Sequence, residues 1–168
     1  NHIVSDDVLL KIKNINETLN ANLPEEEVYR NLSWKLKRLE FSNMFSYGGN
    51  NIVDFTKLNG IVGMFAPNAN GKSALLDALS FALFDTCSRA YKAENILNNK
   101  KNDFYCKVIF EIDGQEYTVE RTAKKQRKGN VKVDVDFYTY DDLGEKVSMN
   151  GDQRRTTDVN IRKVIGTY

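Results

Sequence analysis

The sequence is poor in several features that define whole classes of proteins. Its two cysteines, Cys87 and Cys106, supply no disulfide framework or zinc site, which is typical of a reducing compartment. No apolar run approaches the roughly 18 residues of a membrane span, and no basic-then-apolar leader opens the chain. Neither sign of charge dominates, since 24 lysines and arginines face 23 aspartates and glutamates. We therefore expect a cytoplasmic protein (host cytoplasm if viral, nuclear if eukaryotic) with no membrane partner, and not a wholesale polyanion binder of the histone type.

The residues that are present are those of a folded domain. Of the 168 residues, 41% are hydrophobic, 28% are charged and 11% are aromatic, which is enough apolar material for one domain with a real core. The chain opens on Asn1 rather than methionine, so we expect a part of a longer protein.

The first 33 residues differ in pattern from the rest. Apolar residues between Val8 and Leu19 fall at helical spacing behind an N-cap at Ser5, and a second short helix is expected from Pro24. We assign residues 1–33 to a helical N-terminal extension.

From Trp34 onward the alternation of apolar and polar residues predicts strands, and Asp113-Gly114 is a strong hairpin signal. The expected strands are Trp34–Phe41, Ile52–Phe55, Phe104–Ile112, Glu116–Thr122, Val131–Tyr140 and Glu145–Met149, with a buried strand at Gly60–Phe65. Helices are expected after Gly71-Lys72, with Leu75, Leu76, Leu79 and Leu83 facing inward, and at Asp158–Ile165, with Gly166 as the C-cap. The predicted fold class is α/β, with a mixed sheet rich in antiparallel hairpins.

The chemically informative stretch is Ala66-Pro-Asn68-Ala69-Asn70-Gly71-Lys72-Ser73. It satisfies the relaxed phosphate-loop pattern of a small residue, four residues and then Gly-Lys-Ser. Such a loop between a strand and a helix points backbone N–H groups at phosphates, and the helix N-terminus adds positive potential. In this pattern Gly71 permits close backbone approach, Lys72 reaches the β- and γ-phosphates, and Ser73 places its hydroxyl on Mg²⁺. A strand-to-helix turn with an incidental lysine is the weaker interpretation, because an apolar run precedes the loop and an amphipathic helix follows it.

Around this loop the sequence resembles a known family. The resemblance rests on Leu36-Lys-Arg-Leu-Glu-Phe-Ser-Asn-Met-Phe-Ser-Tyr-Gly-Gly, Ile52-Val-Asp-Phe55, the loop itself and Ser73-Ala-Leu-Leu-Asp77-Ala78. These segments resemble the N-terminal head lobe of the SbcC/RecF/SMC class, ABC-type ATPases of DNA repair and chromosome maintenance. The likeness covers residues 34–168 and is greatest to double-strand-break repair ATPases, including the large subunit of bacteriophage recombination endonucleases. It implies the N-terminal lobe of an ABC-type P-loop NTPase head, with the second lobe absent.

The resemblance also implies site residues. Those that would bind ATP are Asn68, Ala69, Asn70, Gly71, Lys72, Ser73 and Ala74, with Lys72 catalytic and Ser73 on Mg²⁺, while Asn98 and Asn99 fall where the family brings backbone near the adenine or ribose. Ala66 and Ala69 stand where the family has glycines, so either alanine would be strained if its position needs a positive φ. Phe45 or Ser46 occupies the place of an arginine that often touches nucleotide phosphates.

The partners implied by the resemblance are duplex DNA, an SbcD-type nuclease subunit and a second copy of the head, with a long coiled coil between the two lobes. ATP-driven engagement of two heads would control the nuclease on DNA. The family's glutamine loop, hydrophobic run ending Asp-Glu, and Ser-Gly-Gly signature do not occur before Tyr168. We interpret Asp141-Asp142 as a strand end and turn rather than as the acidic element. We therefore expect an ATPase in the full-length protein and no meaningful turnover by this chain alone.

Lys124, Lys125, Arg127 and Lys128 form a basic run in an expected hairpin loop, residues 123–130. The run is either a solvated turn or a contact to the phosphates of duplex DNA. Arg89, after the phosphate-loop helix, is expected at a lobe contact, a DNA-facing turn or a surface loop. Two other functions stay open. One is a non-enzymatic DNA-binding module with a degenerate nucleotide site, and the other is another P-loop enzyme such as a small-molecule kinase, which would need a parallel sheet.

Overall fold

The computed structural model describes residues 6–21, 34–68, 70–90 and 92–166, which belong to two compact units divided after Leu32. The first unit contains helix α1 (Asp6–Ala21), as the apolar spacing predicts. Its Val8, Ile12 and Ile15 side chains are exposed. The predicted N-cap at Ser5 and the helix expected from Pro24 lie outside the described residues.

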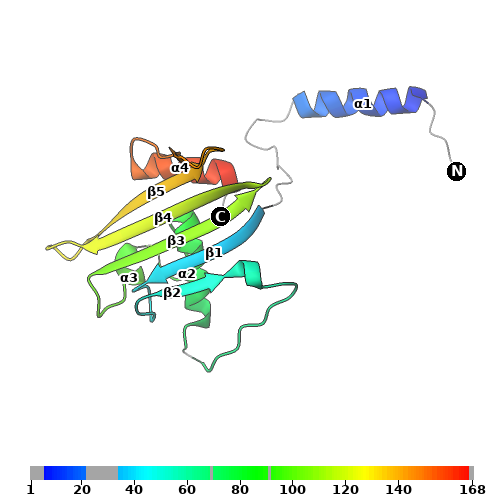
Figure 1. Cartoon of the computed structure of the whole chain (residues 1–168). Coiled ribbons are helices and arrows are strands. Elements are labelled where there is room, and N and C mark those ends of the chain that lie inside the picture. Colours follow the sequence, from blue (N-terminus) through cyan, green and yellow to red (C-terminus); the bar gives the residue numbers. More distant parts are fainter. Residues whose placement is uncertain (1–5, 22–33, 69, 91, 167–168) are drawn as a thin grey trace. The chain divides into compact units, whose positions relative to one another are not determined.

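The second unit is built on one antiparallel sheet with the order β2-β1-β3-β4-β5-β6 (Figure 1). The strands are β1 (Trp34–Ser42), β2 (Asn51–Asp54), β3 (Asp103–Ile112), β4 (Gln115–Lys125), β5 (Val131–Tyr140) and β6 (Lys146–Ser148). Asp113 and Gly114, both at positive φ, make the two-residue turn between β3 and β4, as the sequence predicts. The α/β class and the run of antiparallel hairpins are therefore confirmed.

The β4–β5 hairpin is longer than the sequence suggests. Strand β4 continues past Thr122, and Lys124 and Lys125 pair with Lys132 and Val131. The loop predicted at 123–130 is wrong in extent, because Ala123 is buried and continues the inward alternation of β4. The actual tip is residues 126–130, closed by backbone bonds between Gln126 and Asn130 and between Gly129 and Gln126.

The helices α2 (Lys72–Phe84), α3 (Ala93–Ile96) and α4 (Arg154–Ile165) pack against the sheet (Figure 1), and a 3₁₀ turn, η2 (Phe55–Lys57), follows β2. Every second side chain of β3, from Phe104 to Ile112, is buried in the core. The Phe81 ring of α2 meets the Phe104 ring edge to face at 5.6 Å. No helix in the described parts of the chain is long and apolar enough to cross a membrane.

The inward face of α2 differs from the predicted one. Leu83 is buried, but Leu76 is 63% exposed, and the helix instead buries Ala74, Ala78, Phe81 and Ala82. Leu75 and Leu76 cannot both face the sheet, because adjacent helical residues point about 100° apart. Small alanine side chains allow the helix to lie close to the strands. Helix α4 ends at Gly166 as predicted, but it begins at Arg154, four residues earlier than expected.

The buried strand predicted at Gly60–Phe65 is wrong. Residues 60–65 form no strand and are exposed, with Phe65 at 94%. A strand requires a neighbour for its N–H and C=O groups, and both edges of β1 are already occupied, by β2 and β3. The apolar composition of a buried strand is present, but the described residues offer this segment no partner.

Candidate nucleotide-binding site

The phosphate-loop residues lead directly into the N-terminus of α2. Gly71 is the N-cap residue, with φ 79° and ψ 11°, a left-handed conformation that glycine adopts without strain. Its lack of a side chain leaves no cap oxygen to bond to the N–H groups of the first turn. The helix therefore begins with backbone donors aimed outward, which is the arrangement that binds anions.

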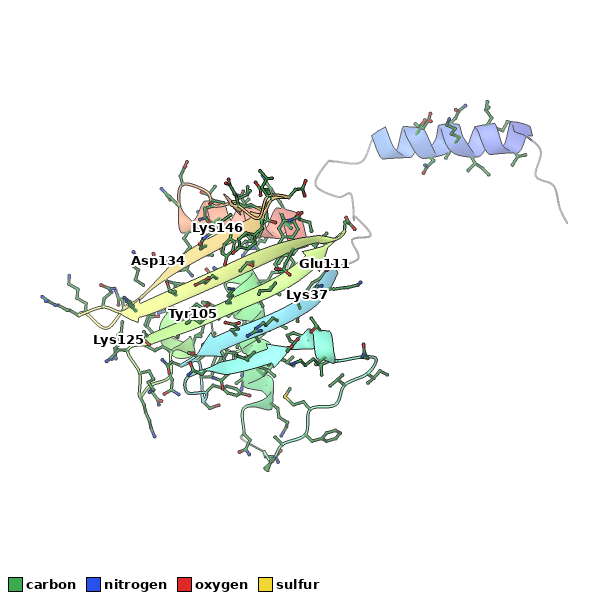
Figure 2. All side chains as sticks on the ribbon, viewed as in Figure 1. Lys37, Tyr105, Glu111, Lys125, Asp134 and Lys146 are labelled. Carbon is green, nitrogen blue, oxygen red and sulfur yellow. The ribbon has the colours of Figure 1, made fainter. Side chains whose placement is uncertain are left out.

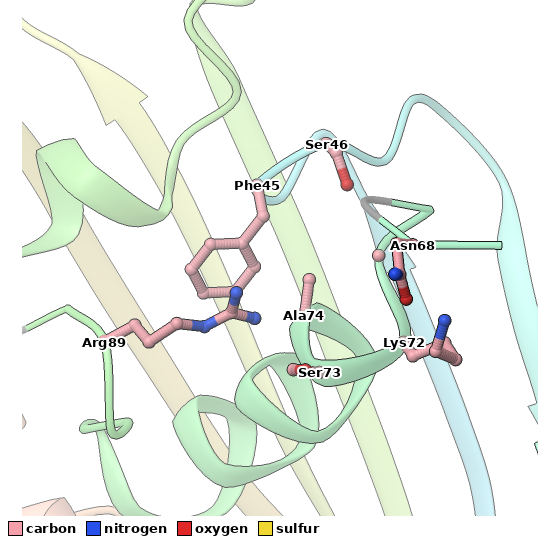
Figure 3. A pocket seen from close by; sticks show the side chains of 8 residues that line it. Phe45, Ser46, Asn68, Lys72, Ser73, Ala74 and Arg89 are labelled. Carbon is pink, nitrogen blue, oxygen red and sulfur yellow. The ribbon is translucent and has the colours of Figure 1, made fainter. Parts of the chain in front are cut away.

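A cavity of about 460 Å³ lies at this helix end (Figure 3). It is lined by Phe45, Ser46, Asn68, Gly71, Lys72, Ser73, Ala74 and Arg89. The structure thus brings together the predicted residues Asn68, Gly71, Lys72, Ser73 and Ala74. Asn70, Asn98 and Asn99 are not among the lining residues, and Ala69 lies outside the described residues.

The Lys72 side chain folds back over its own loop. Its Nζ donates to the carbonyl oxygen of Pro67 at 2.9 Å and to that of Ala66. These neutral carbonyls are weaker acceptors than a phosphate oxygen, so a bound phosphate would compete for the ammonium group. Ala66 is not among the described non-glycine residues with positive φ, so alanine introduces no backbone strain at this position, where the family has glycine.

Arg89 is a second cation in the cavity, and the sequence did not assign it to the nucleotide site. Its Nε donates to Asp77 Oδ2 at 2.5 Å, and its guanidinium lies over the Phe45 ring, 5.9 Å from the centroid. Asp77 is nearly buried on α2 and also accepts from the Ser88 hydroxyl at 2.9 Å. The Asp77 carboxylate therefore fixes the base of the Arg89 guanidinium while about half of that side chain stays exposed. No sequence spacing signals this pairing, because it depends on the loop after α2 folding back.

Phe45 and Ser46 reach the cavity because the turn after β1 is held from both sides. The Phe45 N–H donates to the Ile96 carbonyl at 2.7 Å, and the Asn98 N–H donates to the Asn43 carbonyl at 2.9 Å. Asn98 also donates from Nδ2 to the Tyr47 carbonyl at 3.1 Å. Asn98 thus supports the turn, and its contact with adenine or ribose stays a prediction, as does that of Asn99.

The basic run lies at one end of the sheet, away from the turn between β3 and β4. The four side chains of Lys124, Lys125, Arg127 and Lys128 are all exposed. The Lys125 N–H donates to the Asn102 carbonyl at 2.8 Å, which brings the exposed Lys100 and Lys101 beside the hairpin. Figure 2 shows Lys125 at this end of the sheet and the Lys37–Glu111 ion pair nearer the other. We call these six cations the basic end.

Asp141 and Asp142 lie in the exposed turn between β5 and β6, as predicted. Asp141 Oδ1 accepts from the backbone N–H groups of Leu143 and Glu145, both at 2.9 Å. This carboxylate therefore stabilises a turn, and neither aspartate lines the cavity.

Comparison with known proteins places these observations in context. The AAA domain family matches residues 38–166. An uncharacterized protein of Acanthamoeba polyphaga mimivirus is 40% identical over 142 residues, covering 80% of this chain and 10% of the relative. The SbcC component of the nuclease SbcCD from Clostridium acetobutylicum is 25% identical over 134 residues, covering 77% and 11%. Exonuclease subunit 2 of Escherichia phage RB69 is 33% identical over 94 residues, covering 55% and 16%.

A solved structure shares the fold. The recombination mediator protein RecF, determined with ATP, superposes with a TM-score of 0.51 at 23% identity, covering 69% of this chain and 29% of RecF. The resemblance stated from the sequence is confirmed by these relatives. The chain spans about a tenth of the length of the first two curated relatives.

Proposed function

The chain belongs to the AAA domain family, in which its relatives are SbcC-like DNA repair proteins, and on this basis we propose that residues 34–168 are the N-terminal, ATP-binding lobe of a DNA repair or recombination ATPase head. The observation that carries the proposal is the cavity at the N-terminus of α2, lined by the phosphate-loop residues. Its volume of about 460 Å³ lies within the range of small-molecule sites.

In this proposal the loop and the two cations divide the work of binding the triphosphate. Backbone N–H groups at the start of α2 bond to phosphate oxygens, and the helix dipole adds to their attraction. Lys72 exchanges its loop carbonyls for the β- and γ-phosphates, and this is its catalytic role. Arg89, already oriented by Asp77 and Phe45, supplies the cation that the turn after β1 lacks.

The donor set of the cavity fits Mg²⁺ bound together with a nucleotide. Ser73 lines the cavity with a hydroxyl, and the described residues contain no cluster of three or more acidic, histidine or cysteine side chains that would form a protein cage. Mg²⁺ in nucleotide sites takes few protein ligands and completes its shell with phosphates and water. Ser73 would hold the ion, and the ion would neutralise charge on the phosphates.

We propose further that the remaining parts of a much longer protein complete the enzyme. They would supply a second lobe, a coiled coil and the residues that activate water, so that this chain alone does not hydrolyse ATP. Two heads would close on ATP, and their engagement would couple duplex DNA to an SbcD-type nuclease. The exposed apolar segment 60–65 supports a second lobe, because such a segment is normally covered.

The test is a titration of the full-length protein with ATP, with and without Mg²⁺. We expect the Lys72→Ala variant to lose ATP binding and ATP-dependent engagement of heads, because the loop has no other lysine. Ser73→Ala should weaken mainly the Mg²⁺-dependent part of the affinity. Lys57→Ala, on the turn after β2, is the matched control and should bind as the wild type does. Wild-type hydrolysis by the Lys72→Ala protein would contradict the site assignment.

The alternative of a non-enzymatic DNA-binding module keeps one specific observation in its favour, the basic end. The titration separates the two, because that module would bind DNA without binding ATP. The small-molecule kinase loses support, since every described strand pair is antiparallel.

A further inference from the structure

The backbone at the start of α2 receives a hydrogen bond from outside the helix. The carbonyl oxygen of Gly71 accepts the first helical bond, from Leu75 N at 3.1 Å. The same oxygen accepts a second bond, from the Tyr47 hydroxyl at 3.0 Å. Tyr47 lies 24 residues earlier, in the turn after β1, and it was not identified as a site residue from the sequence.

These two bonds fix the orientation of the peptide plane between Gly71 and Lys72. A trans peptide is planar, so its N–H points opposite to its C=O. With the Gly71 oxygen held toward the helix interior by two donors, the Lys72 N–H points outward from the helix N-terminus. That N–H is one of the free first-turn donors and faces the side on which an anion binds.

The tyrosine is itself held in place on several sides. Its ring packs edge to face on the buried Phe41 ring, with centroids 5.0 Å apart. Its N–H donates to the Met44 carbonyl at 2.9 Å, and its carbonyl accepts from Asn98. The hydroxyl is therefore presented by a rigid turn rather than by a free side chain.

Close packing between the turn and the loop supports the same role. A Cβ atom on Gly71 would lie 3.0 Å from the Ser46 Oγ and 3.0 Å from the Tyr47 ring. The loop backbone thus rests directly on residues 46 and 47, and only glycine allows this contact together with the positive φ.

We propose that Tyr47 is a positioning residue for the phosphate-binding loop: its hydroxyl sets the direction of the Lys72 N–H through the Gly71 carbonyl. The inference rests on the proposed function, because it concerns the triphosphate part of that site. It identifies the polyphosphate, and not the nucleoside, as the part of the ligand that senses Tyr47.

The experiment compares wild type, Tyr47→Phe and Tyr140→Phe in the full-length protein. Tyr47→Phe removes the hydroxyl and retains the ring against Phe41. Tyr140→Phe removes a hydroxyl from β5 and is the matched control. The dissociation constants of ATP and of inorganic tripolyphosphate are measured by calorimetry, and the thermal midpoint of the nucleotide-free protein is measured beside them.

Tyr47→Phe should weaken ATP and tripolyphosphate by the same factor, about three- to tenfold, the usual effect of one hydrogen bond. Its midpoint without ligand should match that of Tyr140→Phe. A lowered midpoint with unchanged dissociation constants would mean that Tyr47 is merely structural and would overturn the inference alone. Weakened ATP with unchanged tripolyphosphate would also overturn it. A wild-type protein that binds neither ligand would overturn the proposed function and the inference together.

Discussion

Arg121 shows how a single residue joins the site helix to the rest of the lobe. Its side chain is fully buried on β4, and its Nε donates to the Ala82 carbonyl at 2.9 Å. Its Nη2 donates to Asp158 Oδ1, on α4, at 2.8 Å. The guanidinium thus satisfies carbonyls at the C-terminal end of α2, where a positive charge is favoured, and links α2 to α4.

Replacing Arg121 with methionine should cost about 3–5 kcal/mol of unfolding free energy, because it leaves the nearly buried Asp158 carboxylate without its partner. The control, Arg155→Met, changes an exposed arginine of α4 and should cost less than about 0.5 kcal/mol. Urea unfolding of the 168-residue chain, followed by the fluorescence of its single tryptophan, Trp34, measures both. Equal costs for the two variants would show that the buried network is not a stabilising link.

At the residue scale, local patterns were readable and long-range partners were not. The sequence identified Gly71, Lys72 and Ser73, because the loop motif is contiguous. It did not identify Arg89 or Tyr47 as site residues, because each reaches the loop only through tertiary structure, Arg89 by its bond to Asp77 and Tyr47 by its bond to Gly71. The concern about strain at Ala66 needed a backbone angle that no sequence provides.

At the scale of elements, the same distinction separates correct predictions from wrong ones. Alternation predicted the strands from β1 to β6 within a few residues, because one face of that sheet packs on helices. It failed at 60–65, because an apolar run states that a segment prefers burial without stating which strand covers it. It also shortened the β4–β5 hairpin, because Lys124 and Lys125 look like loop residues although they continue a ladder.

The β4–β5 hairpin carries the prediction of this scale, which concerns DNA. Replacing Lys124, Lys125, Arg127 and Lys128 with serine should weaken duplex binding by the full-length protein. The slope of log affinity against log salt should flatten by about two to four units, because each lost phosphate contact removes about 0.9. Adding Lys100→Ser and Lys101→Ser, at the same end, should flatten it further. ATP affinity should not change, since these residues do not line the cavity.

A matched control for the hairpin removes the same number of charges elsewhere. Lys35, Lys57, Arg155 and Lys163 lie outside the basic end, on β1, η2 and α4. Their replacement with serine should leave the salt slope close to that of the wild type, because the contact is local rather than a matter of net charge. If the hairpin variant and the control change the slope equally, the basic run is a solvated turn.

At the scale of the whole molecule, the unusual feature is apolar surface where the site loop begins. Ile61 is fully exposed, and Val62, Met64 and Phe65 are also exposed, immediately before the phosphate loop. An exposed apolar run of this kind marks a contact surface. The first two curated relatives are about ten times as long as the chain, so their remaining sequence offers ample material to cover it.

The last prediction compares the same substitution in two lengths of protein. Phe65→Ser removes a side chain that is 94% exposed in this chain, so the 168-residue chain should change its unfolding free energy by less than about 0.5 kcal/mol. If a second lobe buries Phe65 in the full-length protein, the substitution there should cost about 3–5 kcal/mol. Leu143→Ser, which changes an 86% exposed residue of the β5–β6 turn, should be neutral in both. Thermal unfolding of the two variants in both lengths measures the difference. Equal behaviour of Phe65→Ser in both lengths would mean that no other part of the protein packs on this segment, and the proposed second lobe would then have to contact a different face.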